Sequence, residues 1–225
     1  MKVYIVHGLN SALDKHWFAY LVGELAKRNI SCFCLPMPNP TAPKAEEWLE
    51  FLKKEIHMDD QTVLIGHSVG CVSVLTYLAN TGAIALGTIL VSGFDEPLKR
   101  LPQLDPFITL YKAQPSIAPL ENSYVFAALD DQSVPYQMID ELSRHLDSVL
   151  IRYPHGGHFK EEDGFHTFPA LLHKVEEIFK KCYKDRFCSF SIIEERKSKG
   201  KTDLIIEVKY LDNNEKEKIK NVSDT

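Results

Sequence analysis

A serine flanked by glycines, between a predicted strand and a predicted helix, constrains this chain more than any other feature. Residues 66–70 read Gly-His-Ser-Val-Gly, with the serine at Ser68. The apolar run Thr62–Ile65 before it predicts a buried strand, and the apolar segment Cys71–Ala79 after it predicts a buried helix. A Gly-x-Ser-x-Gly turn in this context is typical of a nucleophile elbow, where small neighbours allow a tight turn that exposes the serine hydroxyl.

The rest of the chain alternates strand-like and helix-like segments. The predicted strands are Lys2–Val6, Ile30–Leu35, Thr62–Ile65, Leu86–Val91, Tyr124–Leu129 and Ser148–Arg152. The predicted helices are Lys15–Arg28, Ala45–Ile56, Cys71–Leu78, Tyr136–Leu146 and His166–Tyr183. Apolar strands separated by helices predict an α/β fold, with a mostly parallel sheet covered by helices on both faces. Ligands of such sheets bind at the carboxyl ends of the strands, so we expect the chemistry in the loops there.

Two of these loops carry titratable candidates. Asp130 and Asp131 follow a predicted strand, and either carboxylate could orient an imidazole or simply cap the next helix. His158 follows two glycines at the end of another strand, so the backbone would position it as a general base, a solvated loop histidine being the alternative. A metal site formed by His155, His158 and His166 is a weaker alternative, because no cysteine or carboxylate stands at ligand spacing.

The order Ser68, Asp131, His158 is the chain order of the α/β-hydrolase triad. Serine is a poor nucleophile at neutral pH, so it needs the adjacent base that His158 would supply. The tetrahedral oxyanion needs backbone donors. The Val69 N–H is one candidate, and the Leu9 N–H in the turn after the first strand is the other, with the next N–H along the chain as its alternative.

Several motifs together carry a family resemblance. They are Val-His-Gly at residues 6–8, Trp17, Ile-Gly-His-Ser-Val-Gly-Cys at residues 65–71, Asp-Asp-Gln-Ser-Val-Pro at residues 130–135 and Gly-Gly-His-Phe at residues 156–159. The chain resembles, over residues 1–183, the small lidless serine hydrolases typified by the retinoblastoma-binding serine hydrolase. The resemblance implies a compact α/β-hydrolase without an N-terminal antiparallel hairpin. It also implies Ser68 as nucleophile, His158 as base and Asp131 as acid, with Asp130 the alternative acid.

The same resemblance implies carboxylesterase-like activity on short acyl esters, without a cofactor. Where larger hydrolases insert a cap domain, this chain has a short connection between the predicted strands Leu86–Val91 and Tyr124–Leu129. We therefore expect a shallow, open site that accepts small, uncharged acyl esters or thioesters. Most apolar residues of the connection should pack on the sheet, and some should line an acyl pocket. These residues are Phe94, Leu98, Leu101, Leu104, Phe107, Ile108, Leu110 and Tyr111.

Residues 184–225 depart from the family pattern. Apolar and polar residues alternate around Phe190 and Ile192 and again over Leu204–Tyr210, which predicts a two- or three-stranded antiparallel extension with turns at residues 196–200 and 212–214. A hairpin alone in water is marginally stable, so its apolar face should cover something. We expect a hydrolase domain over residues 1–183 and an extension over 184–225 that forms a homodimer or packs on the domain.

Composition excludes several other classes. A net charge of -5 over 225 residues argues against nucleic acid or an anionic membrane as the main partner. The sequence enters a strand at once, without a cleavable signal, and its five cysteines form no disulfide-like framework, so we expect a cytoplasmic protein. A non-catalytic binding or scaffold protein on the same fold, working through the extension, is the alternative function. A haloperoxidase or other reaction run on the same triad is also compatible with the sequence.

Overall fold

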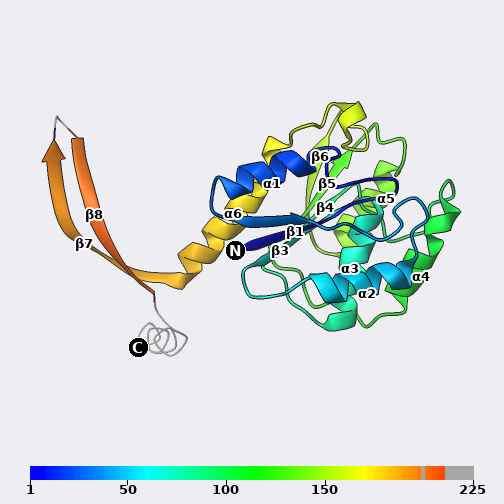
Figure 1. Ribbon diagram of the computed structural model, residues 1–225, viewed down its shortest axis with the longest axis horizontal. Coiled ribbons are helices and arrows are strands. Elements are labelled where there is room, and N and C mark those ends of the chain that lie inside the picture. The colour runs from blue at the N-terminus through cyan, green and yellow to red at the C-terminus, as the bar shows by residue number, and fades with distance from the viewer. Residues whose placement is uncertain (199–200, 211–225) are drawn as a thin grey trace. The chain divides into compact units, whose positions relative to one another are not determined.

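The computed structural model describes residues 1–198 and 201–210 (Figure 1). Six parallel strands form one sheet in the order β2-β1-β3-β4-β5-β6. The strands are β1 (Lys2–Val6), β2 (Ser31–Cys34), β3 (Thr62–His67), β4 (Gly87–Val91), β5 (Ser123–Ala128) and β6 (Val149–Tyr153). The helices are α1 (Phe18–Ala26), α2 (Ala45–Glu55), α3 (Val69–Thr81), α4 (Asp105–Lys112), α5 (Tyr136–His145) and α6 (Pro169–Arg186), with short 3-10 turns at Pro102–Leu104 and Glu161–Asp163.

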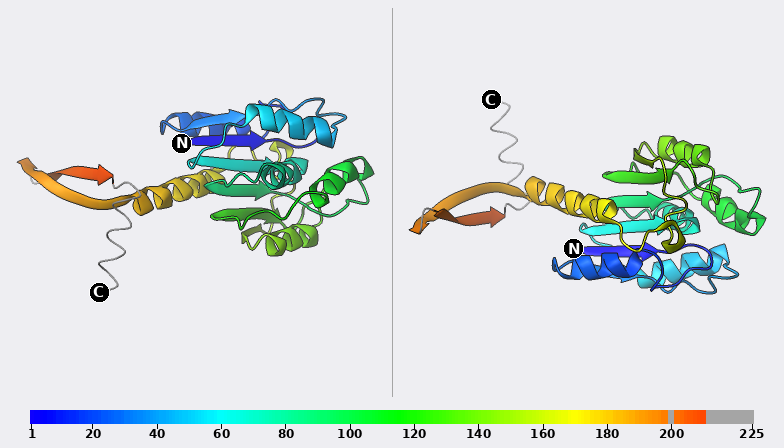
Figure 2. Two further views of the ribbon diagram at one scale, coloured as in Figure 1. Left: turned by 90° about the horizontal axis from the view of Figure 1, so that it is seen from below. Right: turned by 90° about the horizontal axis from the view of Figure 1, so that it is seen from above.

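The prediction of a mostly parallel sheet between two layers of helices is confirmed, and all six predicted strands are present. In the left view of Figure 2 the sheet runs from the blue edge of β1 and β2 to the green edge of β5 and β6. The predicted helices differ from the observed ones in detail. The first helix begins at Phe18 rather than Lys15, since His16 has a positive φ of 56°. Helix α4, in the connection after β4, was not predicted.

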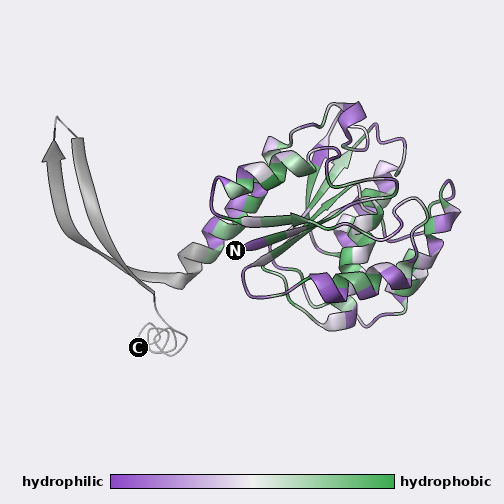
Figure 3. Ribbon diagram, viewed as in Figure 1, coloured by the Kyte–Doolittle hydropathy of each residue, from purple (hydrophilic) through white to green (hydrophobic). Residues whose placement is uncertain are grey.

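Side chains of the central strands alternate between the two helical layers. Tyr4, Val6 and Leu64 pack in a core with residues of α2, α3, α4 and α5. Val3 and Ile5 are fully buried on the opposite face, which α1 and the first turns of α6 cover. Figure 3 shows the strands largely apolar and the outer helices striped with polar residues. Burial on both faces explains why the strands read as continuous apolar runs.

The direction in which successive strands are added to the sheet reverses after β2. It passes from β1 to β2 on one side, and then returns to β3 on the other side of β1. In open parallel sheets a ligand crevice forms at such a switch point, outside the carboxyl ends of the two strands. Here those ends are His7, after β1, and Ser68, after β3. The fold therefore brings the first loop of the chain next to the glycine-flanked serine.

The chain divides into two compact units, Met1–Val175 and a second that begins at Glu176. The second contains the end of α6 and an antiparallel hairpin of β7 (Phe187–Ser198) and β8 (Lys201–Tyr210). In the hairpin, residue 190 pairs with residue 208, and residue 192 pairs with residue 206. All four are apolar positions of the alternating pattern that predicted the extension.

One detail of the predicted extension was wrong. Arg196, Lys197 and Ser198 belong to β7 instead of to the turn. The second predicted turn at residues 212–214, and any third strand beyond it, lie outside the described residues. The domain boundary between residues 183 and 184 stays a prediction. Across the part of the chain that the structure describes, every helix is too short or too polar to cross a bilayer.

Candidate active site

Ser68 occupies a strained turn between β3 and α3. Its φ is 56° and its ψ is -125°, a conformation that residues other than glycine rarely adopt. Two backbone hydrogen bonds hold the turn: the Ser68 N–H donates to the Val91 carbonyl at 2.9 Å, and the Cys71 N–H donates to the Ser68 carbonyl at 2.9 Å. Strain of this kind persists only where surrounding contacts impose it, and it is typical of functional sites.

The glycines on either side of Ser68 are required by close backbone approach. A Cβ at Gly70 would lie 2.1 Å from the Val6 carbonyl oxygen. A Cβ at Gly66 would lie 2.6 Å from the Cα of Cys71. Neither position can carry a side chain unless the backbone moves. This steric requirement is the physical reason for the spacing on which the sequence prediction depended.

The loop after β1 lies directly against Ser68. A Cβ at Gly8 would lie 2.9 Å from the Ser68 Cβ. The Asn10 N–H already donates to the Pro40 carbonyl at 2.8 Å, whereas the Leu9 N–H meets no acceptor among the described residues. Val69 is the first residue of α3, so its N–H has no acceptor within the helix. Within the part of the chain that the structure describes, both amides expected to bind an oxyanion are without an acceptor.

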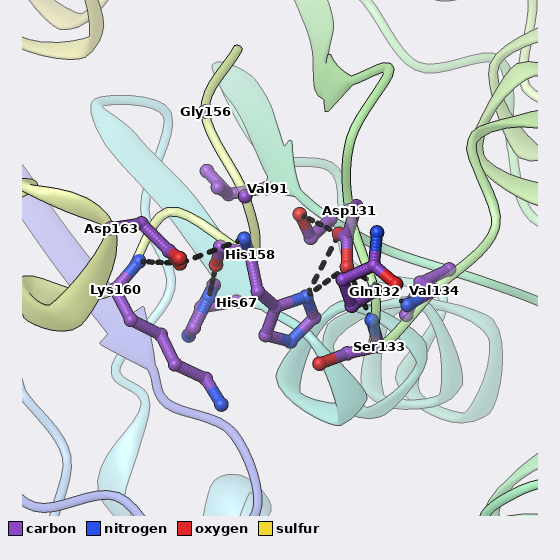
Figure 4. Close-up of polar contacts among 12 residues, drawn as sticks. His67, Val91, Asp131, Gln132, Ser133, Val134, Gly156, His158, Lys160 and Asp163 are labelled. Atoms are coloured by element: carbon purple, nitrogen blue, oxygen red, sulfur yellow. Dashed lines mark hydrogen bonds and ion pairs between the residues drawn. The ribbon is translucent and has the colours of Figure 1, made fainter.

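Asp131 and His158 form a buried pair (Figure 4). Nδ1 of His158 lies 2.9 Å from Oδ2 and 3.1 Å from Oδ1 of Asp131, whose side chain is 0% exposed. Oδ1 also accepts the Ser133 and Val134 N–H groups at 2.8 and 3.0 Å, and Oδ2 accepts the Ser92 hydroxyl at 2.8 Å. Burial acts to raise the pKa of the Asp131 carboxyl, but the hydrogen bond and charge of His158, the Val134 amide and the Ser92 hydroxyl outweigh it and lower the pKa. Asp131 is therefore ionised beside the imidazole.

Asp130 has a different position. Its Oδ1 accepts the N–H groups of Gly156 and Gly157, both at 2.9 Å, and its Oδ2 lies 3.4 Å from Nδ1 of His155. The two glycine N–H groups lower the pKa of the Asp130 carboxyl. Of the two aspartates left open by the sequence, Asp131 contacts the His158 ring and Asp130 holds the backbone that carries it.

Two further groups fix the backbone of the His158 loop. The Asp163 carboxylate accepts the His158 N–H at 2.8 Å and the Lys160 N–H at 3.1 Å. The His158 carbonyl accepts Nε2 of His67 at 2.9 Å. Gly157 has a φ of 53°, and a Cβ there would lie 2.2 Å from the Asp163 carboxylate. The loop is therefore fixed on both sides, and its backbone positions the His158 ring.

Ser68 and His158 line one cavity of about 330 Å³, together with Gly8 and Leu9. No hydrogen bond joins the Ser68 hydroxyl to His158 among the described residues, a common condition of catalytic pairs without substrate. Ser133 also lines this cavity and an adjacent one of about 530 Å³. The remaining walls of the smaller cavity are mostly polar: Asn10, Ser11, His16, His67, Leu101, Lys160 and Glu162.

The apolar residues of the connection after β4 serve both the cavities and the core. Leu101 lines the smaller cavity, and Leu98 lines the larger one with Met138, Pro97 and Pro135. Leu98 is also buried in the core, as are four other apolar residues of the connection that line neither cavity: Phe94, Leu104, Phe107 and Ile108. Within the described residues no group of three or more histidine, cysteine, aspartate or glutamate side chains is arranged to hold a metal ion.

Comparison with known proteins decides the family. The serine hydrolase family model matches residues 3–177. The chain belongs to the serine hydrolase family. The ydeN gene product of Bacillus subtilis (strain 168) is 35% identical over 184 residues, which cover 80% of this chain and 97% of the relative. Serine hydrolase RBBP9 of Rattus norvegicus is 28% identical over 159 residues, covering 69% of this chain and 84% of the relative.

Solved structures place this serine hydrolase among α/β-hydrolase folds. The crystal structure of the B. subtilis ydeN product superposes with a TM-score of 0.72 at 32% identity, covering 80% of this chain and 98% of that one. Est1E from Butyrivibrio proteoclasticus, in a structure with ferulic acid, superposes with a TM-score of 0.62 at 14% identity, covering 81% and 89%. The predicted resemblance to small serine hydrolases is confirmed, and the second comparison supports the fold alone.

Sequence reasoning missed several contributors to this serine hydrolase site. Ser92, which bonds Asp131, directly follows β4, so its place at the carboxyl edge of the sheet was an available signal. Asp163 and His16 carried no such signal, because their roles depend on loops whose conformation no periodicity predicts. His67 stands inside the recognised motif, but its bond to the His158 carbonyl joins residues that are 91 positions apart.

Proposed function

We propose that this serine hydrolase is a carboxylesterase-like enzyme that cleaves small acyl esters or thioesters with a triad of Ser68, His158 and Asp131. The observation that carries the proposal is the buried pair of Asp131 and His158, at 2.9 Å, lining the cavity that also contains Ser68. A carboxylate only accepts hydrogen bonds, so Nδ1 of His158 carries the proton and Nε2 is free to act as a base.

The proposed reaction has two halves. The Ser68 hydroxyl attacks the acyl carbon while Nε2 of His158 takes its proton, and Asp131 stabilises the imidazolium. The Leu9 and Val69 N–H groups bind the oxyanion, and the turn at Ser68 is a nucleophile elbow. When the tetrahedral intermediate collapses, His158 returns the proton to the leaving oxygen or sulfur, and the acyl group stays on Ser68. Water, activated by the same imidazole, then releases the acid and restores the hydroxyl.

The shape of the cavities supports a small substrate. The cavity at Ser68 has a volume of about 330 Å³, near the lower end of typical ligand sites. The adjoining cavity of about 530 Å³ offers an apolar wall that includes Leu98 and Met138. An acyl chain that extends past Ser133 would enter this second cavity. No cofactor takes part in the proposed reaction.

A fluorophosphonate probe tests the proposal directly. We expect the wild-type chain to be labelled, and Ser68→Ala to lose the label while its thermal unfolding is unchanged. His158→Ala should lower kcat for a short acyl ester by several orders of magnitude. His155→Ala is the matched control, because this exposed loop histidine contacts Asp130 instead of Asp131. A folded wild-type chain that is neither labelled nor active would favour a scaffold protein instead.

We also propose a cytoplasmic location and self-association through residues 184–225. Cys32, Cys34, Cys71 and Cys182 are free cysteines, which supports a reducing compartment. Burial raises the pKa of the Cys34 thiol to about 12, so this thiol is unreactive. Light scattering of the full chain over a range of concentrations tests the association, and a monomer mass throughout would contradict it.

A further inference from the structure

His16 is held in an uncommon conformation at the edge of the catalytic cavity. Its φ is 56°, in the left-handed region. Its N–H donates to the Glu161 carboxylate at 3.2 Å, and its ring Nδ1 accepts the Glu161 N–H at 3.3 Å. Lys15 pairs with the same carboxylate at 3.1 Å. Contacts with a residue 145 positions away therefore hold both the backbone and the ring of His16.

These contacts determine which ring nitrogen carries hydrogen. Burial lowers the pKa of His16, so the ring is neutral near pH 7. Because Nδ1 accepts an amide N–H, the hydrogen of the neutral ring is on Nε2. No described residue accepts a hydrogen bond from that Nε2–H, although the ring lines the cavity with Ser68 and His158. His16 therefore presents a fixed, neutral donor that has no partner among the described residues.

Two charged side chains line the same wall. Lys160 and Glu162 follow His158 in its loop, and both line the cavity. Neither the Lys160 ammonium nor the Glu162 carboxylate makes an ion pair with another described residue. The charges of Lys160 and Glu162 cancel. The side of the cavity formed by His16, Lys160 and Glu162 therefore offers an imidazole N–H and an ammonium as donors and a carboxylate as acceptor, without a net charge. A neutral group with several hydroxyls, which both donate and accept, suits such a wall better than an alkyl group or a single ion.

We propose that the leaving group of the substrate is a small polyhydroxylated alcohol, and that the His16 Nε2–H donates to one of its hydroxyl oxygens. This inference rests on the proposed esterase function. In that reaction His158 protonates the leaving oxygen, so the leaving alcohol lies beside His158. His16, Lys160 and Glu162 line the same cavity as His158. The acyl chain would extend past Ser133 into the adjoining cavity, whose lining includes the apolar residues Leu98 and Met138.

The test compares two esters of one acid. Glyceryl monobutyrate and propyl butyrate share the acyl group and differ in the two free hydroxyls of the alcohol. We expect the wild-type enzyme to prefer the glycerol ester by about tenfold or more in kcat/KM, because polar groups of the wall stay unpaired with propyl butyrate. Equal kcat/KM for the two esters, or a preference for propyl butyrate, would overturn the inference.

Two substitutions of His16 separate binding from folding. Asparagine tolerates the left-handed backbone, but its shorter side chain withdraws the donor, whereas glutamine places an amide N–H near the position of Nε2. We expect His16→Asn to lower the preference for glyceryl monobutyrate about tenfold, mainly through KM, and His16→Gln to retain most of it. His57→Gln is the control, since this exposed imidazole lies outside the cavity.

The outcomes distinguish this inference from the proposed function. Fluorophosphonate labelling of Ser68 in each variant reports whether the catalytic turn is intact. If both variants are labelled and His16→Asn and His16→Gln change the preference for glyceryl monobutyrate equally, His16 has only a structural role. That result would overturn the inference and leave the proposed esterase function unaffected. A wild-type chain without labelling or ester hydrolysis would instead reject the proposed function, and the inference with it.

Discussion

Nε2 of His67 donates a hydrogen bond to the carbonyl oxygen of His158 at 2.9 Å. His67 directly precedes Ser68, so the turn that carries the serine also holds the loop that carries the imidazole. His67 is fully buried, and burial, with the nearby charge of His158, holds the pKa of His67 well below its ordinary value. A neutral ring that donates through Nε2 is therefore a structural link between the two halves of the site.

His67→Phe tests this link. A phenyl ring fills a similar volume among the rings of Trp17, Phe18 and His158, but it cannot donate to the carbonyl. We expect kcat for a short acyl ester to fall about tenfold, in line with the loss of one buried hydrogen bond that positions the base. Ester hydrolysis by purified protein measures the effect. An unchanged kcat in a folded His67→Phe variant would show that the link does not position His158.

Asp131→Asn and Asp130→Asn form a matched pair of substitutions in adjacent residues. Asp131 contacts Nδ1 of His158, whereas Asp130 contacts the backbone of Gly156 and Gly157. An asparagine at 131 cannot stabilise the imidazolium, and its amide can favour the wrong tautomer. We expect kcat to fall by about three to four orders of magnitude for Asp131→Asn.

For Asp130→Asn we expect a loss below about tenfold, because an amide oxygen can still accept the two glycine N–H groups. Steady-state hydrolysis of one ester by both variants provides the measurement. Losses of similar size in the two variants would mean that the acid of the triad is misassigned.

Much of the fold could be predicted because its signals are local. Continuous apolar runs predicted the six strands, and the glycines at 66 and 70 predicted the turn at Ser68. The roles of residues in the short connection after β4 were harder to predict, because its apolar residues serve both the core and the cavities. Both Leu98 and Leu104 are buried in the core, and periodicity did not show that only Leu98 also lines one of the two cavities.

The site was predictable only as far as residue type and strand order allow. Because Asp130 and Asp131 both follow the same predicted strand, the sequence places both at the carboxyl edge of the sheet. Only the loop geometry shows which carboxylate contacts the His158 ring. The network around the pair depends on contacts between distant loops. Glu161 and His16 are 145 positions apart, and no pattern within either segment specifies the other.

Gly70→Ala and Gly23→Ala test the steric reason for the glycine spacing. Alanine at 70 would place its Cβ 2.1 Å from the Val6 carbonyl oxygen, whereas alanine at 23, within α1, meets nothing within 4 Å. We expect Gly70→Ala to lower the free energy of unfolding by about 3 kcal/mol or more through overpacking. Gly23→Ala should raise it by about 0.5–1 kcal/mol through helix propensity. Urea denaturation measures both, and equal effects would contradict the role of close approach at residue 70.

Stability should fall as the pH drops through the ordinary range of histidine. Burial lowers the pKa of His7 and holds the pKa of His67 well below its ordinary value, so both bind fewer protons in the folded chain than in the unfolded chain below about pH 6.5. The unfolded state then binds more protons, and the free energy of unfolding decreases as the pH falls. A histidine that stays neutral in the folded state contributes a loss of about 1.4 kcal/mol between pH 7.5 and 5.5. Urea denaturation at both pH values should therefore show a smaller loss for His67→Phe than for the wild-type chain, and identical losses would show that His67 gains its proton equally in both states.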